Sequence, residues 1–118
     1  MGYSLYRGRP VPLEREIQAG IVIWLRLFAK AKVLVNRTER SYGKRMLGAR
    51  DRDPEQRGSP DIIAALDGGR TLWLEIKRPG GKPSADQLRW HAELRALGHL
   101  VVIATCLEEV EAAIWMRR

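Results

Sequence analysis

The segment from Thr71 to Lys77 constrains the fold more strongly than any other part of the chain. Alternate positions within it hold two leucines and an isoleucine, and this period of two predicts a β-strand with one face in a hydrophobic core. A helical pattern follows at about 85–97, and residues 100–105 form a continuous apolar stretch typical of a strand buried on both faces. A strand, a helix and an adjacent strand in this order predict a parallel crossover connection.

The rest of the chain completes the predicted sheet. Residues 67–70 carry turn chemistry between two strands, which predicts a hairpin. Residues 36–59 are polar, basic and weakly periodic, so we expect a functional, mobile or partly helical segment there. The other expected elements are a helix at about 13–31, a strand at 33–35, a strand at 61–66 and a helix at 107–116. We therefore predict a single α/β domain over residues 1–118, with a mixed central β-sheet flanked by helices and a flexible arm at 1–11.

The formal net charge is +7, and all of the excess lies in the first half of the chain. Residues 1–60 hold 13 Lys or Arg against 6 Asp or Glu, whereas residues 61–118 hold 8 of each kind. A localised basic field favours a polyanionic partner, either a nucleic acid or an anionic membrane surface, although a solvated basic face has the same composition. The side chains expected to contact nucleic-acid phosphates are Arg40, Lys44, Arg45, Arg50, Arg52 and Arg57.

Other features argue against several classes of protein. No apolar stretch approaches the roughly 18 residues that span a bilayer, and the first helix carries too few basic residues to favour a lipid surface. The N-terminus lacks the apolar segment of a secretion signal. Cys106 is the single cysteine, so an intramolecular disulfide is impossible, and we expect a buried, unreactive thiol in a cytoplasmic protein. His91 and His99 lack metal-ligand spacing and are expected on a helix surface and in a loop.

Charged residues at one end of the predicted hairpin carry the chemistry. Glu75 and Lys77 share one face of their strand, and hairpin pairing could bring Asp61 close to Glu75. Two carboxylates that converge at a strand end can hold a hard divalent cation, and the Ile76 carbonyl could add an oxygen. Lys77 would then lie beside the metal-bound water. Alternatively, Glu75 and Lys77 could form a surface pair at a sheet edge, with Asp61 capping a turn.

The context of these residues resembles a known family. Gly58-Ser59-Pro60-Asp61 is followed after 13 residues by Glu75-Ile76-Lys77, then by a glycine- and proline-rich loop and Gln87. This pattern resembles the PD-(D/E)xK nuclease superfamily and, within it, the VRR-NUC domain of virus-type replication-repair nucleases. The resemblance covers about residues 12–115 and is most specific at 58–87. It implies a restriction-endonuclease-like core.

The resemblance also implies roles for single residues. The metal-binding aspartate of the family falls on Asp61, and its acidic residue and lysine fall on Glu75 and Lys77. The glutamine that opens the following helix falls on Gln87, and the glutamate of the first helix falls on Glu16. The implied metal ligands are therefore Asp61, Glu75, the Ile76 carbonyl and Glu16.

Two of these assignments have alternatives. Gln87 lies three residues after Ser84, so the pair also matches a capping box that stabilises a helix start. Glu14 could replace Glu16, because both suit the positive end of the first helix.

The function implied by the resemblance is Mg²⁺- or Mn²⁺-dependent hydrolysis of DNA phosphodiester bonds. Small stand-alone members of the family look like structure-selective endonucleases that act as homodimers on branched DNA, such as four-way (Holliday) junctions. We expect a phage or bacterial protein of this kind. The alternatives are a module that binds branched DNA without cutting it, or a nuclease that acts on flaps or RNA. A sequence-specific restriction enzyme is disfavoured, because so short a chain has no separate recognition domain.

Overall fold

The computed structural model describes residues 5–6, 9–10, 12–36 and 54–116. Within the expected N-terminal arm, β1 (Leu5–Tyr6) and β2 (Arg9–Pro10) pair as a short antiparallel ladder. The remaining residues of that arm lie outside the described residues, as does segment 37–53. Five of the predicted phosphate contacts fall in that segment, namely Arg40, Lys44, Arg45, Arg50 and Arg52.

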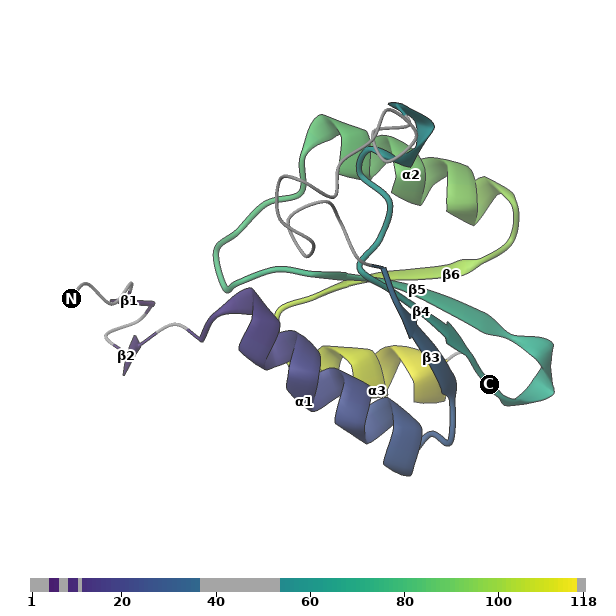
Figure 1. Ribbon diagram of the computed structural model, residues 1–118, viewed down its shortest axis with the longest axis horizontal. Helices are drawn as coiled ribbons and strands as arrows, with labels where there is room; N and C mark the ends of the chain where they lie inside the picture. The colour runs from purple at the N-terminus through teal and green to yellow at the C-terminus, as the bar shows by residue number, and fades with distance from the viewer. Residues whose placement is uncertain (1–4, 7–8, 11, 37–53, 117–118) are drawn as a thin grey trace, which may run out of the picture.

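A four-stranded mixed sheet forms the centre of the molecule (Figure 1). Its strands, in spatial order, are β3 (Lys32–Val35), β4 (Ile62–Ala65), β5 (Thr71–Ile76) and β6 (Leu100–Ala104). The first three strands pair antiparallel, and β6 runs parallel to β5. The predicted hairpin and the predicted parallel crossover are both confirmed.

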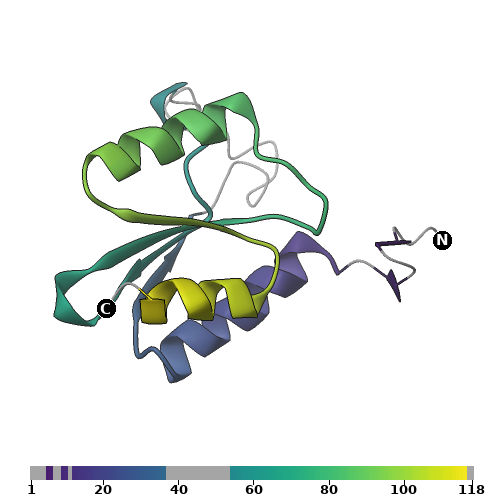
Figure 2. The same cartoon turned by 180° about the vertical axis from the view of Figure 1, so that it is seen from behind.

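Helices cover both faces of this sheet. The helix α2 (Ala85–Ala96) lies on one face, whereas α1 (Glu14–Leu27) and α3 (Leu107–Met116) lie together on the other (Figures 1 and 2). This arrangement confirms the expected α/β class, with a mixed sheet between helices. None of the helices in the described part of the chain is long and apolar enough to cross a membrane.

The hydrophobic core lies between the sheet and the pair of helices α1 and α3. The apolar face of β5 contributes Leu72, Leu74 and Ile76, which are at most 1% exposed, and Ile21 and Leu25 of α1 pack in the same cluster. Because side chains alternate along a strand, the other face of β5 points toward α2. The polar residue Glu75 therefore lies under α2, away from the main core.

Two element ends differ from the sequence-based expectation. The first helix ends at Leu27 instead of 31, because the chain turns at Lys30, whose φ of 54° is left-handed and not helical. The helix expected at about 85–97 ends at Ala96. Leu97, which is 75% exposed, caps the C-terminal end of α2, and Gly98 then turns the chain away with a φ of 93°.

Candidate active site

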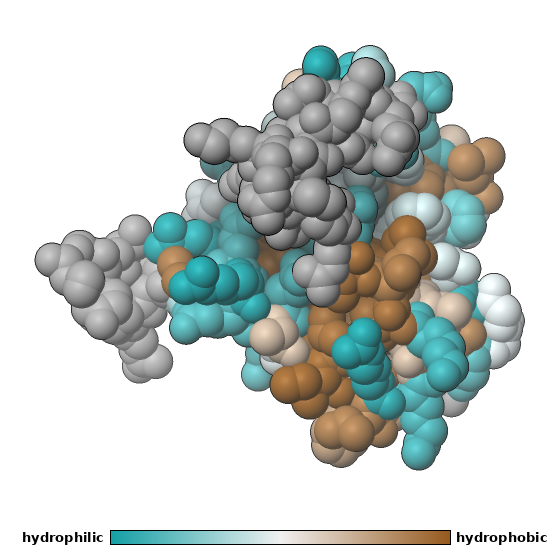
Figure 3. Space-filling view, viewed as in Figure 1, coloured by the Kyte–Doolittle hydropathy of each residue, from teal (hydrophilic) through white to brown (hydrophobic). Residues whose placement is uncertain are grey.

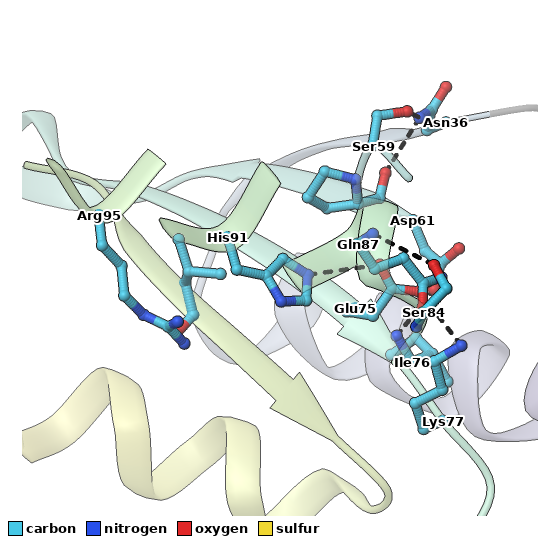
Figure 4. Close-up of polar contacts among 12 residues, drawn as sticks. Asn36, Ser59, Asp61, Glu75, Ile76, Lys77, Ser84, Gln87, His91 and Arg95 are labelled. Atoms are coloured by element: carbon cyan, nitrogen blue, oxygen red, sulfur yellow. Dashed lines mark hydrogen bonds and ion pairs between the residues drawn. The ribbon is translucent and has the colours of Figure 1, made fainter. Parts of the chain in front are cut away.

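Asp61 is held against the end of β5 by a backbone hydrogen bond. The N–H of Ile76 donates to Asp61 Oδ2 over 2.7 Å (Figure 4). The segment that leads to Asp61 is fixed in turn by Asn36, whose side-chain amide donates to Ser59 Oγ at 2.7 Å and to the Pro60 carbonyl at 3.0 Å. Asp61 is thus positioned from both strands that flank it, and its carboxylate reaches the level of Glu75.

Glu75 is a buried carboxylate on an inner strand of the sheet. Its side chain is 1% exposed, and β5 has a neighbouring strand on each side. Its Oε2 accepts a hydrogen bond from Gln87 Nε2 at 2.9 Å, and Lys77 Nζ lies 4.0 Å from the same oxygen. The alternative of a surface pair at a sheet edge is therefore wrong for Glu75.

The environment of Glu75 favours its protonated form. The pKa of Glu75 is raised to about 9, first by burial and then by the nearby negative charge of Asp61, against an opposing effect of Lys77. The side chains of Asp61 and Glu75 are close enough to share a hydrogen bond. Two carboxylates crowded in this way need a proton or a cation between them.

The two glutamates at the start of α1 lie differently with respect to this pair. The Glu16 side chain folds back on its own helix, where its Oε1 accepts a hydrogen bond from the Leu13 N–H at 2.9 Å. Glu14 is the one whose negative charge contributes to the raised pKa of Glu75. The structure thus brings Glu14 toward the carboxylate pair and uses Glu16 to cap the helix.

Gln87 combines the two roles that its sequence position suggested. Its side-chain oxygen accepts from the Ser84 N–H at 2.8 Å, while Ser84 Oγ accepts from the Gln87 N–H at 3.2 Å, which completes a capping box. The amide nitrogen at the same end of the side chain donates to Glu75. The cap therefore orients the group that contacts the carboxylate.

His91 contradicts the expectation of a helix-surface histidine. It is 0% exposed, and its Nε2 lies 3.6 Å from Glu75 Oε1 (Figure 4). Burial lowers the pKa of His91, and the positive charges of Arg95 and Lys77 lower it further. The signal that could have placed it is the spacing of Gln87, His91 and Leu94, which puts all three on one face of α2.

Arg57 is the only predicted phosphate contact within the described residues, and it is exposed. It lines a groove of about 610 Å³ between α2 and the short helix Pro54–Gln56, just upstream of the segment that leads to Asp61. Trp90 and Arg89 of α2 line the same groove, and Trp90 Nε1 donates to the Glu55 carbonyl at 3.0 Å. Basic, acidic and aromatic side chains thus line this groove, and Arg57 lies four residues before Asp61 in the chain.

The fold and this arrangement define an α/β chain in which two carboxylates and a lysine meet at one end of a mixed sheet. Two solved structures have the same fold. One, described as "VRR_NUC domain", has a TM-score of 0.66 and 22% sequence identity over 89% of this chain and 97% of its own. The other, described as "VRR_NUC domain protein", has a TM-score of 0.60 and 22% identity over 87% of this chain and 85% of its own. The chain therefore has the VRR_NUC fold, as the resemblance in its motifs implied.

One comparison of sequences adds to this finding. The protein "Putative nuclease p44" of Acyrthosiphon pisum secondary endosymbiont phage 1 is 50% identical over 50 residues, which are 42% of this chain. The match spans about half, 54%, of that protein's length. No family model matches the chain.

Proposed function

We propose that this chain is a metal-dependent nuclease that hydrolyses DNA phosphodiester bonds, with Asp61, Glu75 and Lys77 at the centre of its active site. The observation that carries the proposal is the buried Glu75 carboxylate, held beside Asp61 and 4.0 Å from the Lys77 ammonium. Two converging carboxylates do not stabilise a structural core, because their mutual repulsion opposes folding. The VRR_NUC fold and the phage protein named a nuclease support the same conclusion.

The donor set fits a hard divalent cation such as Mg²⁺ or Mn²⁺. Glu75 Oε1 is buried and has no hydrogen-bond partner among the described residues, and the pKa of Glu75 is raised by burial and by the negative charge of Asp61, whose repulsion a cation would offset. No three His, Cys, Asp or Glu side chains gather as a metal cluster in the described ranges. Mg²⁺ is typically held by one or two carboxylates, with water and substrate oxygens completing its shell. Asp61, Glu75 and the Ile76 carbonyl would hold it, with Glu14 better placed than Glu16 to assist.

The side chains of the site have distinct roles in the proposed reaction. When bound, the cation supplies Lewis-acid polarisation of a phosphate oxygen and lowers the pKa of water. Asp61 is pre-oriented by the Ile76 N–H, and Gln87 restrains Glu75. Lys77 orients the attacking water and offsets negative charge that develops on phosphorus. Lys77 is partly buried, with a side-chain exposure of 15%, so its charge is only weakly screened by solvent.

The finer parts of the proposal concern the substrate and the assembly. Arg57 beside the groove, together with the basic residues of segment 37–53, would contact phosphates without reading sequence, which suits a nuclease that selects branched DNA by shape. Symmetric cutting of a four-way junction needs two sites related by a two-fold axis, and therefore a homodimer. Apolar side chains are exposed on α1 and at its C-terminal end, on the edge strand β3 and on α3, namely Ile23, Leu27, Phe28, Leu34, Trp115 and Met116. Figure 3 shows a hydrophobic patch on the face of the molecule that carries α1 and β3. A second copy of the chain would cover such a face.

A cleavage assay tests the proposal. Labelled four-way junction, flap, duplex and single-stranded DNA, and an RNA hairpin, are incubated with the protein and Mg²⁺, Mn²⁺ or EDTA. We expect metal-dependent cleavage, strongest on branched DNA, and a loss of at least about 100-fold in Lys77→Ala and Asp61→Asn. Lys82→Ala, at an exposed lysine in the following loop, is the matched control. Tight binding of branched DNA without cleavage in either metal would instead identify a binding module, and preferred cleavage of RNA or flaps would replace the proposed substrate.

A further inference from the structure

We infer that His91 is a positioning residue for Glu75, and that it fixes the carboxylate by donating a hydrogen bond from Nε2 to Glu75 Oε1. The inference rests on the proposed function, because the carboxylate that His91 orients is the proposed metal ligand. It goes further in giving His91 a role at the site that neither the motifs nor the comparisons assign.

The contact is close and is enclosed by protein. His91 Nε2 lies 3.6 Å from Glu75 Oε1, and the two side chains are 0% and 2% exposed. Within the described ranges, neither His91 nitrogen has a hydrogen-bond partner, and Glu75 Oε1 has none either. A buried polar atom without a partner costs on the order of 1–3 kcal/mol. A hydrogen bond from His91 Nε2 to Glu75 Oε1 satisfies both of these atoms and leaves the second lone pair of Oε1 for a cation. A small movement of the imidazole toward Oε1 completes the bond.

His91 and Gln87 approach the Glu75 carboxylate from α2, one at each oxygen, and we call this pair of side chains the clamp. The two residues are one helical turn apart, so both project from the same face of α2 toward β5. Gln87 Nε2 contacts Oε2 and His91 Nε2 approaches Oε1, so each carboxylate oxygen faces one donor (Figure 4). The capping box at Ser84 sets where α2 begins, and it therefore fixes the positions of Gln87 and His91 along β5.

The consequence of the clamp concerns the orientation of the carboxylate plane. The last torsion of a glutamate side chain is broad, so one hydrogen bond leaves the plane free to swing about it. A second donor on the other oxygen removes this freedom and leaves the remaining lone pairs directed toward Asp61. Outer-shell groups that orient a metal ligand typically account for about 10- to 100-fold in metal affinity. We expect a change of this size when the Nε2 donor of His91 is lost.

A purely structural role predicts a different pattern among variants. A glutamine places its amide nitrogen near the position of Nε2, whereas an asparagine reaches only as far as Nδ1, and a leucine has no donor. If His91 merely fills space, His91→Leu should be the mildest of the three changes. If it positions Glu75, His91→Gln should be the mildest.

The first measurement is the affinity of the full chain for Mn²⁺ by titration calorimetry, without DNA. We expect His91→Asn and His91→Leu to bind about 10- to 100-fold more weakly than the wild type, and His91→Gln to stay within about threefold. His99→Gln is the control, because His99 packs edge-on against Trp73 at 5.7 Å and makes no contact with Glu75. Circular dichroism and thermal melting establish that each variant is folded. If the leucine variant fails to fold, the glutamine and asparagine pair still separates the two roles.

The second measurement needs no variant. The ¹⁵N shifts of the His91 ring in the metal-free protein report which nitrogen carries the proton, and we expect the Nε2–H form. A ring protonated only at Nδ1 cannot donate to Oε1 and overturns the inference, as do equal Mn²⁺ affinities in the wild type and His91→Leu. These results leave the proposed function intact. A wild-type chain that neither binds Mn²⁺ nor cuts DNA refutes the proposed function itself.

Discussion

Replacing Glu75 by glutamine should stabilise the metal-free protein at neutral pH. The pKa of Glu75 is raised to about 9 from its usual value of 4.5, first by burial and then by the charge of Asp61. Above about pH 4.5 the unfolded chain releases this proton, while the folded protein retains it until the pH approaches 9. The free energy of unfolding of the wild type therefore falls as the pH rises through this window. Glutamine is neutral over this whole pH range, so the free energy of unfolding of the variant does not fall for this reason.

The size of the effect follows from the width of the window. A pH of about 7.5 lies three units above the usual glutamate pKa of 4.5. Over these three units the free energy of unfolding of the wild type falls by at most about 4 kcal/mol. Glutamine has the shape of glutamate, and its amide oxygen can still accept the hydrogen bond from Gln87. We expect Glu75→Gln to gain at least about 1 kcal/mol at this pH and to gain nothing near pH 4, where both states of the wild type are protonated.

The assay is urea unfolding of the metal-free proteins in EDTA, measured at several pH values. Glu93→Gln, at an exposed glutamate of α2, is the control and should change stability by less than about 0.5 kcal/mol. Adding Mn²⁺ should stabilise the wild type by about 2.7 kcal/mol at 100 times its dissociation constant, and should stabilise Glu75→Gln much less. A variant that is no more stable than the wild type at neutral pH, or whose advantage does not grow from pH 4 upward, would refute the reasoning that the two carboxylates oppose folding.

Four further predictions test other parts of the structure. Gly58→Ala should cost at least about 2 kcal/mol in thermal or urea unfolding, because Gly58 has a φ of 82° and a Cβ there would lie 2.5 Å from the Asp86 backbone. Gly20→Ala, in a helix with nothing within 4 Å of the added carbon, should instead gain up to about 1 kcal/mol. Arg57→Ala should weaken DNA binding similarly for all sequences and reduce the slope of log affinity against log salt by about 1, as measured by fluorescence anisotropy. Leu34→Lys should shift a homodimer toward monomer in analytical ultracentrifugation and lower junction cleavage; a monomeric wild type would contradict the proposed assembly.

The fold was predictable because its elements carry strong local periodicity. In β5, Leu72, Leu74 and Ile76 occupy alternate positions and are all buried, and burial departs from this alternation at Glu75, which lies buried beneath α2. The order of strand, helix and buried strand then leaves few topologies. Element ends were less predictable, since they depend on single backbone conformations such as the left-handed one at Lys30, which no pattern of hydrophobicity encodes.

The centre of the site was predictable for a different reason. Asp61, Glu75 and Lys77 lie on one hairpin, whose short connection leaves little freedom in how the two strands meet. The residues supplied by helices were harder, because their positions depend on the rotation of a whole helix against the sheet. For this reason the sequence could not decide whether Glu14 or Glu16 serves the site. It also assigned His91 to the helix surface, whereas the structure places His91 against Glu75.

The position of Glu75 couples the proposed chemistry to the stability of the fold. The residue lies on an inner strand whose opposite face builds the main core, so the carboxylate cannot move to solvent without disturbing β5. The chain therefore holds it in place with donors from α2 and from Lys77, although burial beside Asp61 disfavours its charge. On the proposed function, a carboxylate kept in such surroundings is unfavourable for folding but is pre-organised for a cation, which would bind without first having to order its ligands. This exchange of stability for pre-organisation would distinguish a metal site from a structural ion pair, and it accounts for the contact between Glu75 and His91, the two polar side chains that are buried within the described ranges.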